Sequence, residues 1–203
     1  MSRQNFSGHY QTYGINVQAA CDHKFRFVYA ALAAPGGANE IAALRKTQLS
    51  QMIQMLPLRR FVVVGNVYVC SETLLTPFSG VEKDDPSKDA FNFYLSQMRI
   101  HIEQPFGLMT GKWRILCKPL QMHLKNVGKV FMCITRLHNF CFNEGNISTN
   151  SIEVNQVSDR EFMCSYVNKS GIAGSSVLRD IIVQDLVQHG LERPDLILIL
   201  NLK

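Results

Sequence analysis

One predicted helix carries a stripe of polar residues that could do chemistry. The stripe repeats every three or four residues: Asn92, Ser96, Arg99, Glu103, Gly107 and Thr110. This spacing places the residues on one face of an α-helix. Such a face is usually apolar because it meets the core, but here it carries a carboxylate and a guanidinium. Glu103 either forms a solvent-side ion pair with Arg99 or presents its carboxylate to a divalent metal.

Pro105 lies two positions after Glu103. A proline inside a helix removes one backbone hydrogen bond, here the bond to the His101 carbonyl, at a cost of about 3 kcal/mol. We therefore expect the helix to kink beside Glu103, or to end near Glu103 and restart with Pro105 in its first turn. Both arrangements hold Glu103 poorly, and metal sites tolerate little misplacement.

Basic residues concentrate in the same part of the chain. Residues 96–140 contain seven lysines and arginines against one acid, for a net charge of +6, whereas residues 1–95 carry +2 and residues 141–203 carry −3. The seven are Arg99, Lys112, Arg114, Lys118, Lys125, Lys129 and Arg136. A clustered basic segment is typical of proteins that contact phosphates, although a solvated helix face gives the same pattern.

The composition is that of an ordinary globular protein. The 203 residues include six cysteines without a CxxC pair, and the first residues have no apolar leader sequence. We expect reduced thiols in an intracellular protein. No apolar run approaches the roughly 20 residues that a membrane helix needs, so no membrane association is expected.

The first part of the chain alternates predicted strands and helices. Periodicity predicts strands over residues 17–21 and 25–32, a helix over 40–56 with Asn39 as its cap, and a buried strand over 61–64. The stretch 71–89 has the composition of a loop.

The second part is predicted to be mostly helical. The polar stripe lies on one helix, and a second helix follows from about residue 123 to Gly145. Residues 146–175 are polar and predicted to be a disordered linker, and 176–203 hold a short amphipathic helix and an apolar tail. The sequence thus predicts a domain over 1–145, a linker, and a C-terminal segment.

Three stretches resemble the DDE-type transposases of the PIF/Harbinger group and their domesticated nuclease-like derivatives. They read "GNVYVCSETLLTPFSG", "FNFYLSQMRIHIEQPFGLMTGKWRIL" and "LHNFC". Upstream, "GHYQTYGINVQAACDHKFRFVYAALAAPGGANE" is similar to a further element of the same family. The resemblance covers about residues 5–145, and the order and spacing of so many elements make it specific.

The resemblance implies an α/β fold, a ribonuclease H-like mixed sheet flanked by helices. In this family two aspartates and one glutamate hold two divalent ions, Mg²⁺ or Mn²⁺, that promote attack on a DNA phosphodiester. Glu103 corresponds to the glutamate on the helix. The seven basic residues of segment 96–140 would neutralise DNA phosphates.

The sequence departs from the family at the metal ligands. The second aspartate position, counted back from Tyr68, falls on Gly65, or on Asn66 if the register slips by one residue. The first aspartate belongs to a strand before "NVQAACD", which we expect to be absent, leaving unpaired backbone groups in the sheet. Only Glu103 of the three carboxylates is then left, and we expect a degenerate copy that does not cleave DNA.

Three functional hypotheses follow. The chain is a catalytically inactive DDE endonuclease domain, a non-catalytic DNA- or protein-binding remnant that uses segment 96–140, or a relic without a selected function. No helix-turn-helix is evident, so recognition of a DNA sequence would need a partner or a lost N-terminal part. The expected partners are DNA, a DNA-binding partner protein or a second copy of the chain in a homo-oligomer. The resemblance implies a nuclear location.

Overall fold

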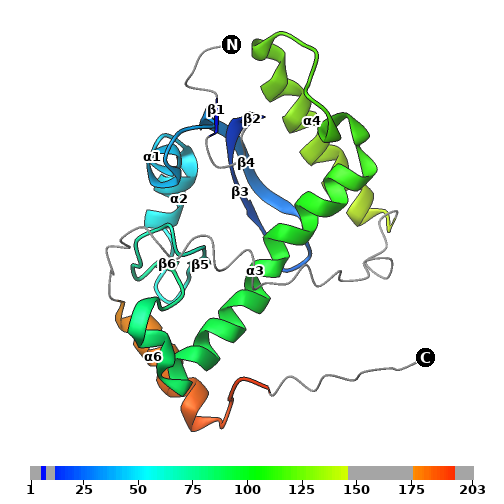
Figure 1. Cartoon of the computed structure of the whole chain (residues 1–203). Helices are drawn as coiled ribbons and strands as arrows, with labels where there is room; N and C mark the ends of the chain where they lie inside the picture. Colours follow the sequence, from blue (N-terminus) through cyan, green and yellow to red (C-terminus); the bar gives the residue numbers. More distant parts are fainter. Residues whose placement is uncertain (1–5, 8–11, 146–175, 195–203) are drawn as a thin grey trace, which may run out of the picture.

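The computed structural model describes residues 6–7, 12–145 and 176–194 (Figure 1). Within these ranges it is a mixed α/β structure with small sheets and covering helices. The strands are β1 (Phe6–Ser7), β2 (Thr12–Tyr13), β3 (Ile15–Cys21), β4 (Phe27–Pro35), β5 (Val62–Val63) and β6 (Leu74–Leu75). The α-helices are α1 (Glu40–Arg45), α2 (Gln48–Gln54), α3 (Pro86–Lys112), α4 (Leu124–Asn143) and α6 (Val177–Gln188). Two 3₁₀ helices are η2 (Gly80–Asp84) and η3 (Arg114–Cys117).

The antiparallel hairpin β3–β4 lies between two groups of helices, with α1 and α2 on one side and α3 and α4 on the other (Figure 1). Successive side chains of a strand point to opposite faces. Val17 and Ala19 therefore join the apolar cluster of α3 and α4, whereas Ala20 joins that of α1 and α2. Both strands predicted here exist. β4 starts two residues later than predicted because Asp22 holds the turn, accepting hydrogen bonds from the backbone of Lys24 and Arg26.

The helix predicted over 40–56 is two helices, and that prediction was wrong. α1 has the predicted cap, since the Asn39 side chain accepts from Ile41 N at 2.9 Å. The chain leaves the helix at Thr47, whose backbone is extended. The Thr47 hydroxyl donates to the Leu44 carbonyl at 2.8 Å. Threonine competes for helix backbone groups in this way, a local effect that apolar periodicity does not register.

The third predicted strand is short and pairs in parallel with a stretch expected to be loop. Val62 lies opposite Leu74 and Val63 opposite Leu75, and Leu75 is completely buried. The loop assignment for 71–89 was therefore wrong at these two residues, and it was also wrong at η2 and at the first turn of α3. Among the described residues, no strand pairing joins β5–β6 to β3–β4.

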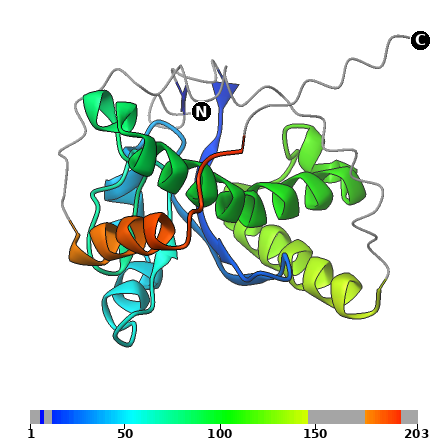
Figure 2. The same ribbon diagram turned by 90° about the horizontal axis from the view of Figure 1, so that it is seen from below.

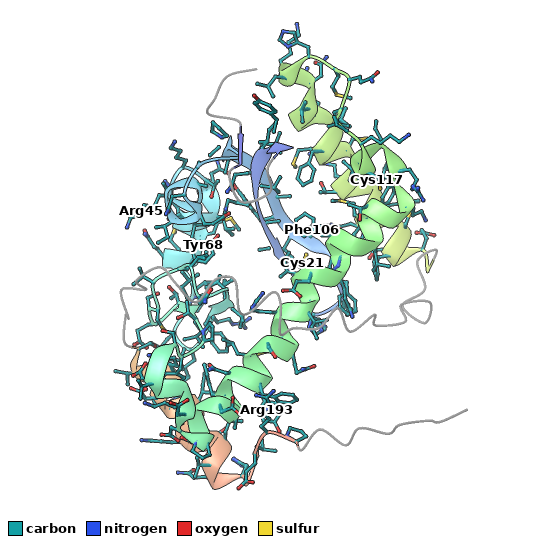
Figure 3. All side chains as sticks on the ribbon, in the orientation of Figure 1. Cys21, Arg45, Tyr68, Phe106, Cys117 and Arg193 are labelled. Carbon is teal, nitrogen blue, oxygen red and sulfur yellow. The ribbon has the colours of Figure 1, made fainter. Side chains whose placement is uncertain are left out.

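Helix α3 connects the two main sheets. It starts at Pro86, with the Asp85 side chain accepting from Ser87 N, and so begins before Asn92, the first residue of the polar stripe. Its first half packs Phe91 and Leu95 against the β5–β6 region, and its second half packs Met109 against the hairpin and α4. Figure 3 shows Phe106 on the side of α3 that faces Cys21 of β3.

Helices α4 and α6 lie at opposite ends of α3 (Figures 1 and 2). α4 ends before Gly145, whose φ of +67° suits glycine, as predicted. α6 has the predicted Ser176 cap and packs Ile182, Val183 and Leu186 onto the cluster of Phe91 and Leu95. The predicted linker and the apolar tail from residue 195 lie outside the described residues, and the three-part domain division stays a prediction. None of the described helices has the length and apolar character to cross a membrane.

Candidate functional site

Glu103 forms an ion pair on the surface of α3. Its Oε1 accepts from Arg99 Nη2 at 2.6 Å, and 54% of its side-chain area is exposed. The solvent-side ion pair, one of the two interpretations drawn from the stripe, is present in the structure. The carboxylate is engaged by a cation from its own helix.

Helix α3 does not end at Pro105. It continues without interruption to Lys112, and Figure 1 shows it as one ribbon. Of the two expected alternatives, a kink beside Glu103 or an end and restart of the helix, the second is therefore excluded. Pro105 is almost completely buried, and burial of its ring offsets part of the cost of the missing hydrogen bond.

Other stripe residues make contacts that hold the fold. The Asn92 side chain accepts from Phe78 N at 2.8 Å and donates to the Phe78 carbonyl at 3.1 Å. Thr110 donates its hydroxyl to backbone carbonyls one turn earlier in the helix. The polar stripe is therefore explained largely by structural hydrogen bonds.

The positions that would supply the second carboxylate follow β5. Tyr68 N donates to the Gly65 carbonyl at 3.3 Å, so Gly65 and Asn66 lie in a turn. A Cβ added at Gly65 would meet no atom within 4 Å, so packing does not demand glycine there. A neutral amide at Asn66 and no side chain at Gly65 make a poor donor set for Mg²⁺ or Mn²⁺. In the described part of the chain, no three His, Cys, Asp or Glu side chains are grouped to hold a metal ion.

A second polar cluster lies between the hairpin and α1. Glu40 Oε2 accepts from Asn16 Nδ2 and from Gln18 Nε2, both at 3.1 Å. Tyr68 donates its hydroxyl to Gln18 Oε1 at 3.1 Å. Burial and the nearby Glu40 carboxylate raise the pKa of Tyr68. Sequence reasoning placed Glu40 at the start of the predicted helix and gave it no role in a site. The signal for the cluster is the period-two pair Asn16 and Gln18 on one face of β3.

The predicted phosphate-binding residues are mostly on the surface. Six of the seven are exposed: Lys112, Arg114, Lys118, Lys125, Lys129 and Arg136. Arg99 is half-buried and paired with Glu103, and the Lys112 ammonium lies 5.7 Å from the centre of the Trp113 ring. Within the described ranges, no ion pair involves Arg114, Lys118, Lys125, Lys129 or Arg136. The structure thus presents a series of exposed cations along η3 and α4.

The "LHNF" stretch binds the end of the hairpin. The Asn139 side chain accepts from Phe27 N at 2.9 Å and donates to the Phe27 carbonyl at 2.8 Å. His138 is completely buried, and its Nε2 lies 3.0 Å from the Phe25 carbonyl oxygen. Burial lowers the pKa of His138, which favours the neutral ring. These two residues attach α4 to the hairpin.

Comparison with known proteins identifies the family. Residues 1–139 match the family of DDE superfamily endonucleases, so the chain belongs to that family. A comparison with curated proteins found no match, and one with solved structures found none either. The endonuclease family and a mixed α/β fold compatible with it, both expected from the motifs, are thus confirmed.

Proposed function

We propose that this chain is a PIF/Harbinger-type DDE endonuclease domain that does not cleave DNA. The observation that carries the proposal is the state of the two carboxylate positions within the chain. Glu103 is exposed and paired with Arg99, and the position of the second aspartate is Gly65 or Asn66. Two-metal phosphodiester cleavage needs several anionic oxygen ligands around the ions. A single carboxylate already bound to a guanidinium does not meet that need.

The proposal includes a ribonuclease H-like arrangement of the two main strand pairs. Three features support it: β3–β4 is antiparallel, β5–β6 is parallel, and α3 contacts both pairs. A strand between β3 and β5 would join the two pairs into one mixed sheet. Among the described residues, both outer edges of each pair are without a strand partner, so such a strand has an edge to join on either side.

Calorimetric titration of Mn²⁺ tests the missing metal site. The chain and the Glu103→Gln variant are titrated side by side, with Glu82→Gln as a control because Glu82 is an exposed acid on η2. We expect no binding that depends on Glu103. Binding tighter than about 1 mM that is lost only in Glu103→Gln would overturn the proposal. Cleavage of supercoiled plasmid in Mn²⁺ by the chain but not by Glu103→Gln would do the same.

A second candidate function is DNA binding without cleavage, in the nucleus, alone or with a DNA-binding partner protein. The observation that favours it is the set of exposed cations on η3 and α4 that form no ion pair with any residue that the structure describes. Fluorescence anisotropy with labelled duplex DNA at several salt concentrations tests it. Affinity should fall with salt, with a slope in the log–log plot of about −0.9 for each phosphate contact. No measurable affinity at low salt would favour a relic without a selected function.

A further inference from the structure

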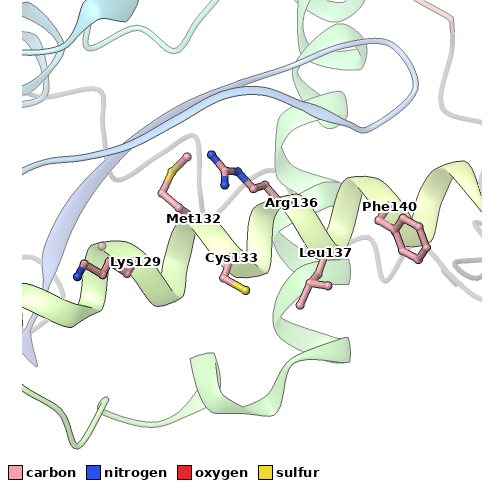
Figure 4. Close-up of a pocket in the computed structure, with 7 residues that line it drawn as sticks. Lys129, Met132, Cys133, Arg136, Leu137 and Phe140 are labelled. Carbon is pink, nitrogen blue, oxygen red and sulfur yellow. The ribbon is translucent and has the colours of Figure 1, made fainter.

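The outer face of α4 carries apolar side chains between cations. A pocket of about 630 Å³ lies on this face, and all its lining residues belong to α4 (Figure 4). They are Gly128, Lys129, Met132, Cys133, Arg136, Leu137 and Phe140. Phe140 is 58% exposed and Leu137 43%. Large apolar side chains grouped on a surface mark interaction sites more often than scattered ones do.

The outer face of α6 has the opposite charge. Val177, Ile181 and Val187 are exposed there, at 69%, 54% and 59%. Asp180 and Asp185 are exposed on the same helix and, at 100° per residue, lie on the two flanks of Ile181. The inner face of α6 is occupied by its packing on α3, and the outer face has no packing partner among the described elements.

We propose that the outer face of α6 in one copy of this chain docks on the outer face of α4 in a second copy. The charges are complementary: Asp180 and Asp185 of α6 meet Lys129 and Arg136 of α4 around apolar contacts. The lengths agree as well. The pocket spans residues 128–140 and α6 spans 177–188, each about 18–20 Å of helix.

Other pairings of these faces are less favourable. Two α4 faces would bring cations against cations, and two α6 faces would bring carboxylates against carboxylates. DNA phosphates would suit Lys129 and Arg136 but leave Met132, Leu137 and Phe140 exposed to water or placed against a charged backbone. A helix with both acidic and apolar side chains, such as α6, would cover the cations of α4 and the apolar side chains between them.

The position of the two faces determines the kind of assembly. α4 and α6 lie at opposite ends of α3, so the contact joins different surfaces of the two copies. Such heterologous contacts form rings when the rotation closes and open chains when it does not. Two short helices bury a small area, so the contact is expected to be weak, with dissociation constants of about 10–100 µM.

Charge-reversed variants test the proposal. The first carries Lys129→Glu and Arg136→Glu, and the second carries Asp180→Lys and Asp185→Lys; all four positions are exposed, so both variants should fold. In sedimentation equilibrium, the mass of the unaltered chain should rise with concentration. Each variant alone should associate at least about tenfold more weakly, because like charges then face each other. An equimolar mixture of the two should recover the association, since every contact again pairs opposite charges.

A matched control separates this contact from a general effect of net charge. Arg114→Glu with Lys118→Glu changes the net charge by the same amount as the α4 variant, at exposed positions outside α4. Its association should equal that of the unaltered chain. The proposal is wrong if the unaltered chain is monomeric up to about 200 µM, or if the mixture of the two reversed variants stays monomeric. Equal weakening by the control and the α4 variant would also refute it.

Discussion

The Asn139 side chain pairs with both backbone hydrogen-bonding groups of Phe27, as a neighbouring strand would. Asn139 lies on α4, and the same arrangement occurs in the first half of α3, where Asn92 pairs with the backbone N–H and C=O of Phe78. An asparagine amide offers one acceptor and two donors, which match a backbone N–H and C=O. The two asparagines in the "FN" and "LHNF" stretches therefore attach helices to extended backbone and need no role in catalysis.

Replacing Asn139 should destabilise the fold. Asn139→Ala leaves the N–H and C=O of Phe27 without their partners, and we expect a loss of roughly 2–3 kcal/mol in the free energy of unfolding. Asn143→Ala is the matched control because Asn143 is exposed at the end of the same helix. Urea denaturation measures both. Equal stability of the two variants would contradict the structural role of Asn139.

The packing of α6 onto the rest of its own chain should depend on Glu72. Its carboxylate accepts from Val177 N at 2.7 Å and from Leu178 N at 3.1 Å, so it caps the N-terminus of α6 from a distant part of the chain. Glu72→Ala should cost about 1 kcal/mol and make α6 more susceptible to limited proteolysis. Glu82→Ala, an exposed glutamate on η2, should change neither. Unchanged proteolysis of α6 in Glu72→Ala would show that its apolar packing alone holds it.

The Arg99–Glu103 pair should contribute little to stability. A double-mutant cycle with Arg99→Ala and Glu103→Ala is expected to give a coupling energy of about 0.3–0.5 kcal/mol that shrinks in salt. Exposure of Glu103 is the physical reason, since water screens the pair. A coupling well above 1 kcal/mol would mean that the two side chains belong to a larger network.

Acidification should destabilise the protein through His138. Its pKa is lowered by burial in the folded state, so the unfolded chain binds the proton more readily. The stabilisation that comes from the neutral His138 ring is therefore complete above about pH 6.5, the pKa of histidine in the unfolded chain. It is lost as the pH falls toward the lower pKa of His138 in the folded protein. Thermal unfolding between about pH 7.5 and 5.5 should show a smaller pH dependence in His138→Gln than in the unaltered chain. An identical pH dependence in both would assign the effect to other groups.

The sequence was sufficient to predict the family and several of the helices and strands. Helices and strands follow from local periodicity and caps, which is why the Asn39 and Ser176 caps and the stop before Gly145 were predicted correctly. The absence of a carboxylate at Gly65 and Asn66 could also be read directly, because it is a property of the residues themselves.

Only the tertiary structure decided the features that depend on contacts between distant residues. The β6 strand is two residues long and exists through pairing with β5, so no local pattern marks it. Pro105 stays inside α3 because its ring is buried, which periodicity cannot anticipate. The orientation of Glu103 toward Arg99 and solvent, and the opposite placement of α4 and α6, depend on how α3 packs across two sheets. Local sequence sets which segments can become helix or strand, and the burial of apolar surface between them decides where their side chains point.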